Sequence, residues 1–139
     1  MAFVIDASAT LPWRFADEAT SWSEALLDRL EAGEEALVPA HWPLEVLNGL
    51  LVARRKGRVT DAQVSEFIED LAALPIRTLP AAATEWPIIL GLAQQHRLTA
   101  YDVAYLDLAQ RAGLPLATLD ADLRKAAAAA GAALVEFAA

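Results

Sequence analysis

Four carboxylates stand where short β-rich runs meet predicted helices, and together they could bind a metal ion. They are Asp6, Glu45, Asp102 and Asp120. Asp6 ends the run FVID (3–6), and Asp120 directly follows PLATL (115–119). Glu45 and Asp102 fall in the first turns of helices that we expect to begin near Pro43 and Thr99. Carboxylate oxygens in a chain with no cysteine and two histidines favour Mg²⁺ or Mn²⁺ over zinc.

Each carboxylate also has a simpler explanation as a helix cap. Acidic side chains stabilise the first turn of a helix by about 0.3–1 kcal/mol. Thr99 and Asp102 match a capping box, and Asp120 suits an N-cap. A convergent cluster is different, because two carboxylates about 5 Å apart repel by roughly 3 kcal/mol at an effective dielectric near 20. Asp102 can belong to both a capping box and a metal site, since a cap at Thr99 would fix the first helical turn and with it the direction of the Asp102 carboxylate.

The order of the expected elements decides where these carboxylates lie. β-rich runs alternate with helical periods and occur at residues 3–6, 36–40, 76–79, 115–119 and 133–137. This alternation predicts a single α/β domain over residues 1–139, with a central parallel sheet of about five strands flanked by helices on both faces. In such folds ligands bind at the carboxyl ends of the strands. We therefore expect all four carboxylates at that edge.

Local signals set the ends of the expected helices. Ser21 with Glu24, and Thr60 with Gln63, match the capping-box spacing, and Gly113 should end the helix that carries Asp102. The only basic cluster, RRKGR (54–58), falls at a predicted helix end, where cations complement the helix dipole. We expect this cluster to lie away from the carboxylates.

The composition limits the partners and the compartment. With 56% hydrophobic residues the chain can bury one core, and a net charge of −8 argues against a surface that coats nucleic acid broadly. The start MAFVIDASA lacks the features of a signal peptide. The Ala-rich stretch 126–135 is shorter than the roughly 20 residues that cross a bilayer. We expect a cytoplasmic protein without a membrane segment.

Two other classes of protein gather carboxylates at strand ends: receiver-type phospho-acceptor domains, and phosphatases with an Asp-x-Asp nucleophile motif. Both need a second acid close to Asp6, but Ala7 and Ser8 follow it. A receiver domain also needs a lysine after its last strand, where this chain has Glu136, Phe137 and alanines. The residues therefore disfavour both classes.

Four motifs carry a family resemblance that spans the chain: VIDASA, PAHWPLEVLNGL, LTAYDVAYLDLA and LPLATLDADL. In this order and spacing they resemble a PIN domain, and more narrowly the VapC-type toxins of type II toxin–antitoxin modules. The resemblance implies a Mg²⁺-dependent endoribonuclease, with Mn²⁺ as a substitute, that cleaves RNA phosphodiester bonds. It also implies a homodimer and a cognate antitoxin protein whose C-terminal segment fills a groove and blocks the site.

The resemblance assigns roles by motif position. The catalytic metal ligands would be Asp6, Glu45, Asp102 and Asp120, with Asp122 as the substitute for Asp120. Ser8 and Thr118 would orient metal-bound water, and Asn48 shares a helix face with Glu45. Asp107 points about 140° away from Asp102 on the helix, so we expect it to face solvent or a partner.

Two further functions use the same fold. One is a PIN-fold binding or scaffold subunit with little catalysis, which the presence of all four carboxylates disfavours. The other is a DNA-directed or structure-specific nuclease that uses the same metal chemistry. The sequence does not separate RNA from DNA as substrate.

Overall fold

Four parallel strands form the sheet at the centre of the fold, which a computed structural model describes for residues 2–136. The strands are β1 (Phe3–Ile5), β2 (Ala36–Val38), β3 (Ile76–Thr78) and β4 (Leu116–Ala117). Their order in the sheet is β3-β2-β1-β4. Val4 of β1 pairs with Leu37 on one side and Leu116 on the other. The whole of β1 is apolar and buried, as is usual for a strand covered on both faces.

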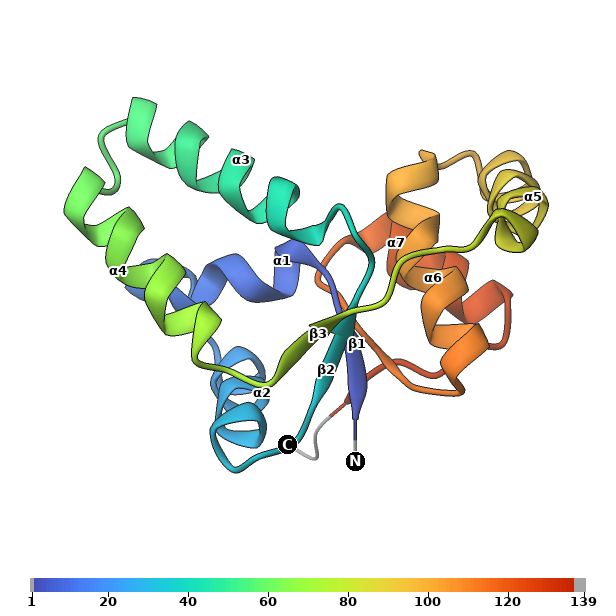
Figure 1. Ribbon diagram of the computed structural model, residues 1–139, viewed down its shortest axis with the longest axis horizontal. Coiled ribbons are helices and arrows are strands. Elements are labelled where there is room, and N and C mark those ends of the chain that lie inside the picture. Colours follow the sequence, from blue (N-terminus) through green and yellow to red (C-terminus); the bar gives the residue numbers. More distant parts are fainter. Residues whose placement is uncertain (1, 137–139) are drawn as a thin grey trace.

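Helices cover both faces of this sheet, as the sequence predicted. They are α1 (Ala7–Thr10), α2 (Ser21–Glu31), α3 (Trp42–Arg55), α4 (Asp61–Ala72), α5 (Trp86–His96), α6 (Ala100–Ala112) and α7 (Ala121–Ala129). Short 3₁₀ turns occur at Leu11–Trp13, Ala16–Glu18 and Ala83–Glu85. Figure 1 shows α1 to α4 on one side of the sheet and α5 to α7 on the other. None of the helices in the described part of the chain has the length and apolar character needed to cross a bilayer.

The segment predicted as a fifth strand, 133–137, adds only a single parallel bridge beside β4. Leu134 bridges to Leu116, whose N–H donates to the carbonyl of Ala133. The N–H of Val135 donates back to the Leu116 carbonyl at 2.9 Å. Phe137 lies outside the described residues. Four strands and this bridge agree with the prediction of about five strands.

The N-terminal cap of α2 lies one residue earlier than predicted. Thr20, not Ser21, caps this helix, because its Oγ1 accepts the N–H of Ser23 at 3.1 Å. Ser23 Oγ accepts the N–H of Thr20 at 2.9 Å in return. The short Ser23 side chain makes this bond while buried, and Glu24 stays exposed. The predicted box at the start of α4 is present.

The chain order creates one switch point in the sheet. From β1 the chain moves outward through β2 to β3, and then returns to the other side of β1 as β4. In open α/β sheets ligands bind at the carboxyl ends of the strands beside such a point, here between β1 and β4. Helices α1, α3, α6 and α7 all begin at this edge (Figure 1). The fold thus directs several helix N-termini to one place.

The two neighbouring leucines of α3 test this packing. Leu50 is fully buried, whereas Leu51 is 57% exposed. We expect Leu50→Ala to lower the free energy of unfolding by about 2–5 kcal/mol, because it leaves a cavity in the core. Leu51→Ala is the matched control and should change it by less than about 0.5 kcal/mol. Urea denaturation measures both, and equal losses would contradict the described register of α3.

Candidate metal-binding site

Asp6 is the most enclosed of the four carboxylates, with 5% of its surface exposed. It follows β1 and caps α1, where its Oδ1 accepts the N–H of Ala9 at 3.0 Å. Ser8 Oγ donates to the same oxygen at 2.7 Å, and Thr118 Oγ1 donates to Oδ2. Burial raises the pKa of Asp6 to about 6, against these three hydrogen bonds, which lower it, and the charge of Asp120 raises it further. A cation at Asp6 would oppose this rise.

Thr118 connects Asp6 to Asp120 across the switch point. It follows β4 directly, and its Oγ1 accepts the N–H of Asp120 at 3.1 Å while donating to Asp6. The Asp120 side chain caps α7 by accepting the N–H of Leu123 at 2.8 Å, so its predicted capping role is confirmed. One hydroxyl therefore links the Asp6 carboxylate to the backbone of Asp120, two residues from opposite ends of the sequence.

Helix α3 packs closely against the residue that follows α1. At Gly49 an added Cβ would come 2.5 Å from Cδ1 of Leu11, which follows α1. An alanine at this position would require the Leu11 side chain to shift. Gly49 thus makes room for the Leu11 side chain against α3, the helix that carries Glu45.

Glu45 is held by two side chains at the start of α3. The hydroxyl of Tyr105 donates to Glu45 Oε1, and His41 Nε2 lies 3.4 Å from the same oxygen. His41 Nε2 also donates to the carbonyl oxygen of Tyr101 at 2.9 Å. Its ring packs edge-on against the rings of Tyr101 and Tyr105. These contacts tie His41 to the start of α6 and give it a role in local structure.

Tyr105 is the residue at this edge that the sequence analysis did not single out. Burial raises the pKa of Tyr105, and the hydrogen bond to Glu45 and the charges of Glu45, Asp6 and Asp102 raise it further. Three carboxylates thus lie within electrostatic reach of one phenol. The signal was available, because a buried tyrosine hydroxyl needs a hydrogen-bond partner.

Asp102 combines a capped backbone with a free carboxylate. Thr99 Oγ1 accepts the N–H of Asp102 at 3.1 Å, which confirms the predicted cap of α6. The reciprocal half of the predicted capping box is not formed. Within residues 2–136 the Asp102 carboxylate makes no hydrogen bond or ion pair. The cap therefore orders the first turn and leaves the charged group open to a ligand.

The four carboxylates share the carboxyl edge of the sheet without forming a closed ligand shell. Among the described residues, no three acidic or histidine side chains are grouped closely enough to hold a metal ion as they stand. The donor set still fits a hard cation, because it consists of carboxylate oxygens. Mg²⁺ typically uses one or two carboxylates and retains several waters, which can reach further groups.

Asp107 corrects a sequence prediction. It was expected to face solvent or a partner, but it is 1% exposed and pairs with Arg111 Nε at 2.8 Å. The reason is that α6 packs against β1, α5 and α7, so more than one side of this helix is covered. Arg111, one turn later, supplies the charge partner that a buried carboxylate requires.

The remaining predicted residues lie around this site. Asn48 and Asp122 are exposed, and Asp122 sits in the first turn of α7, so its role as a substitute for Asp120 stays a prediction. The basic cluster lies at the far end of α3, where Arg54 pairs with Asp61 at 2.7 Å. Arg58 in the same cluster binds Asp17 and Glu18.

Comparison with known proteins identifies the family. Residues 3–129 match the family model of the PIN domain, and the chain therefore belongs to the PIN-domain family. This confirms the resemblance drawn from the four motifs.

Several relatives are similar over most of the chain. A protein named ribonuclease VapC3 from Pyrobaculum aerophilum is 28% identical over 88% of this chain and 92% of its own. Ribonuclease VapC12 from Mycobacterium tuberculosis is 28% identical over 86% of this chain and 88% of its own. The crystal structure of PAE2754 from P. aerophilum has a TM-score of 0.71 at 23% identity, covering 91% of this chain and 79% of that one. M. tuberculosis VapC20, described as a sarcin-ricin loop cleaving toxin, has a TM-score of 0.65 at 18% identity, covering 97% and 99%.

The raised pKa of Asp6 predicts a specific pH dependence of stability without metal. A folded-state pKa near 6, above that of the unfolded chain, means that ionised Asp6 destabilises the fold above pH 6 and that this cost disappears as the pH falls toward 4. We expect Asp6→Asn to be more stable than wild type by about 1–3 kcal/mol at pH 7 in EDTA. The amide can keep the bonds from Ser8 and Ala9, and the Thr118 hydroxyl can rotate to accept.

Urea denaturation of both proteins between pH 4 and pH 8 measures this difference. It should shrink as the pH falls through 6, since wild-type Asp6 then becomes neutral. A variant that is less stable at every pH by a constant amount would contradict the prediction.

Proposed function

We propose that this chain is a metal-dependent endoribonuclease of the VapC toxin type, which hydrolyses RNA phosphodiester bonds. The observation that carries the proposal is the enclosed Asp6 carboxylate, tied through Thr118 to Asp120 at the switch point of the sheet. Glu45 and Asp102 lie at the same edge, near Tyr105. The names of the relatives, ribonuclease VapC, support RNA as the substrate.

The chain's own residues would prepare this edge for Mg²⁺ and for the substrate. Asp6, Glu45, Asp102 and Asp120 would hold the ion, directly or through water. When bound, Mg²⁺ activates water for in-line attack and stabilises charge on the phosphate. Ser8 and Thr118 fix the orientation of the Asp6 carboxylate, and Tyr105 fixes Glu45. The Asp102 carboxylate would give up no hydrogen bond within residues 2–136 on binding an ion.

The substitution Asp102→Asn distinguishes a metal-ligand role of Asp102 from a role in helix capping alone. The substitution leaves the Thr99 cap bond to the backbone intact but removes the charge that a hard cation needs. We expect RNA cleavage in Mg²⁺ to be lost, while the melting temperature in EDTA holds or rises because one repelling charge is gone. Millimolar Mg²⁺ should raise the melting temperature of wild type more than that of the variant.

The matched control is Asp61→Asn at the start of α4, which is exposed and remote from the edge. It should cleave RNA at the wild-type rate. Full cleavage by Asp102→Asn would contradict a ligand role for Asp102. Cleavage of DNA but not RNA by wild type would favour the DNA-directed nuclease, and cleavage of neither would favour the binding subunit.

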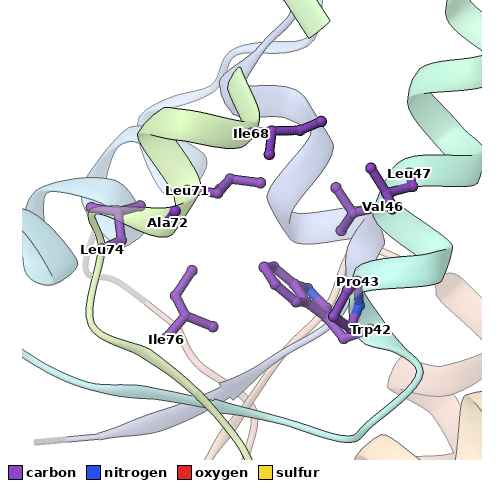
Figure 2. Close-up of a pocket in the computed structure, with 9 residues that line it drawn as sticks. All are labelled: Trp42, Pro43, Val46, Leu47, Ile68, Leu71, Ala72, Leu74 and Ile76. Carbon is purple, nitrogen blue, oxygen red and sulfur yellow. The ribbon is translucent and has the colours of Figure 1, made fainter. Parts of the chain in front are cut away.

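We propose that the cognate antitoxin binds the apolar groove between α3 and α4. Figure 2 shows this groove, with Trp42 and Val46 of α3 facing Ile68 and Leu71 of α4 around a cavity of about 240 Å³. Trp42 and Val46 flank Glu45 on α3. A segment of the antitoxin lying in the groove would therefore reach the acidic edge and could cover it. Such an apolar groove suits the apolar face of an amphipathic helix.

We propose that a second copy of the chain covers α5. This helix and the start of α6 expose Trp86, Ile88, Leu90 and Tyr101, and Trp86 is 66% exposed. Figure 1 shows α5 on the opposite side of the sheet from the α3–α4 groove, so both partners could bind at once. A self-complementary helix face is typical of two-fold dimers.

Charge substitutions on the two surfaces should separate these partners. Trp86→Glu should convert a dimer to a monomer, because it places a charge in the apolar contact. Ile68→Glu, in the α3–α4 groove, should remain dimeric and lose antitoxin binding. Light scattering and titration with the antitoxin measure the two effects. A monomeric wild type at micromolar concentration would contradict the homodimer.

A further inference from the structure

A polar pocket lies beside the acidic edge, between the turn that ends α5 and one face of α7. His96 and Arg97 line one side, and Asp122 and Lys125 line the other, around a volume of about 360 Å³. Arg97 lies two residues before Thr99, which caps the helix of Asp102. Asp122 lies two residues after Asp120, which caps α7. The pocket therefore adjoins the turns that carry two of the four carboxylates.

Two cations in this pocket have no carboxylate partner among residues 2–136. Within the described part of the chain, six of the eleven basic residues form ion pairs with carboxylates: Arg29, Arg54, Arg58, Arg77, Arg111 and Arg124. Arg97 and Lys125 are exposed and form none with the residues of 2–136, although Asp122 lines the same pocket. In a chain of net charge −8, such cations beside an acidic edge are available to a ligand that carries negative charge.

The walls of the pocket show two more unusual features. Arg97 is the one residue other than glycine with a positive φ in the described chain, at φ 56° and ψ 43°. Glycine or asparagine is usual at a helix end with this left-handed conformation. The backbone conformation therefore gives no reason for an arginine at this position. The pocket wall also contains one buried nitrogen, His96 Nε2, that has no hydrogen-bond partner among the described residues.

We infer that this pocket binds a phosphate group of the RNA, away from the scissile bond, through Arg97 and Lys125. The inference rests on the proposed ribonuclease function and assigns a second contact to the same substrate. A guanidinium can bind a phosphate with two hydrogen bonds, and an ammonium adds a point charge. A strand anchored here would be held across the adjoining carboxylates, which themselves repel phosphate in the absence of metal. The two cations give a strongly acidic protein a local attraction for its polyanionic substrate.

The test compares two double variants with equal change of charge. Arg97→Gln with Lys125→Gln removes the pocket cations. Arg55→Gln with Lys56→Gln removes two exposed cations at the far end of α3 that also form no ion pair with described carboxylates. A fluorescein-labelled single-stranded RNA is titrated in EDTA between 50 and 200 mM KCl, read by fluorescence anisotropy. Cleavage of the same RNA in Mg²⁺ gives KM and kcat, and thermal melting checks the fold.

We expect the pocket variant to bind RNA about tenfold more weakly at low salt. The slope of log Kd against log salt should fall by about 1.4, the loss of two contacts to single-strand phosphates. KM should rise with kcat nearly unchanged, because these cations do not touch the scissile phosphate. The control variant should stay within about twofold of wild type in Kd and KM.

Three results would overturn the inference. Wild-type Kd and KM in the pocket variant would leave the nuclease standing and remove the phosphate site. Equal losses in both double variants would show a general effect of net charge. Loss of antitoxin binding with normal RNA binding would assign the pocket to the protein partner. A wild type that neither binds nor cleaves RNA would refute the proposed function itself, which distinguishes the two failures.

Discussion

The burial of the Asp6 carboxylate at the end of β1 is the constraint around which the acidic edge is arranged. A charged group in the interior is unfavourable unless it is hydrogen-bonded or paired. Here an N–H and two hydroxyls meet its oxygens, and one of those hydroxyls belongs to Thr118, at the end of the neighbouring strand. Thr118 also receives the N–H of Asp120. The hydroxyl that compensates the buried charge therefore also joins the ends of β1 and β4, where Asp6 and Asp120 lie.

Helix α6 shows how one helix can serve both the core and the edge. Its first turn carries the free carboxylate of Asp102, and one turn later the buried Tyr105 binds Glu45 on α3. Asp107 and Arg111 then form a pair on a covered side of the helix. The buried polar side chains of this helix, Tyr105 and Asp107, are thus matched to partners, whereas the Asp102 carboxylate has none among residues 2–136. Asp102 is therefore the group of this helix that we propose as a metal ligand.

Much of the fold could be predicted from the sequence, because its signals are local. Buried strands such as FVI require consecutive apolar residues, and the alternation of such runs with helical periods leads to a parallel sheet with helices on both faces. Two details differ from the prediction. Thr20 rather than Ser21 caps α2, because the Ser23 side chain accepts the Thr20 N–H and completes the capping box. The predicted fifth strand forms a single bridge, at Leu134.

The sequence by itself determined that Asp6, Glu45, Asp102 and Asp120 would lie at the carboxyl edge of the sheet, because each follows a strand or begins a helix. Only the tertiary structure decided which groups surround them. Tyr105 bonds Glu45 across 60 residues, and Thr118 bonds Asp6 across 112. The burial of Asp107 was equally hidden, since periodicity gives the direction of a side chain and not what packs against it. Contacts between distant segments depend on how whole elements dock, which no local pattern records.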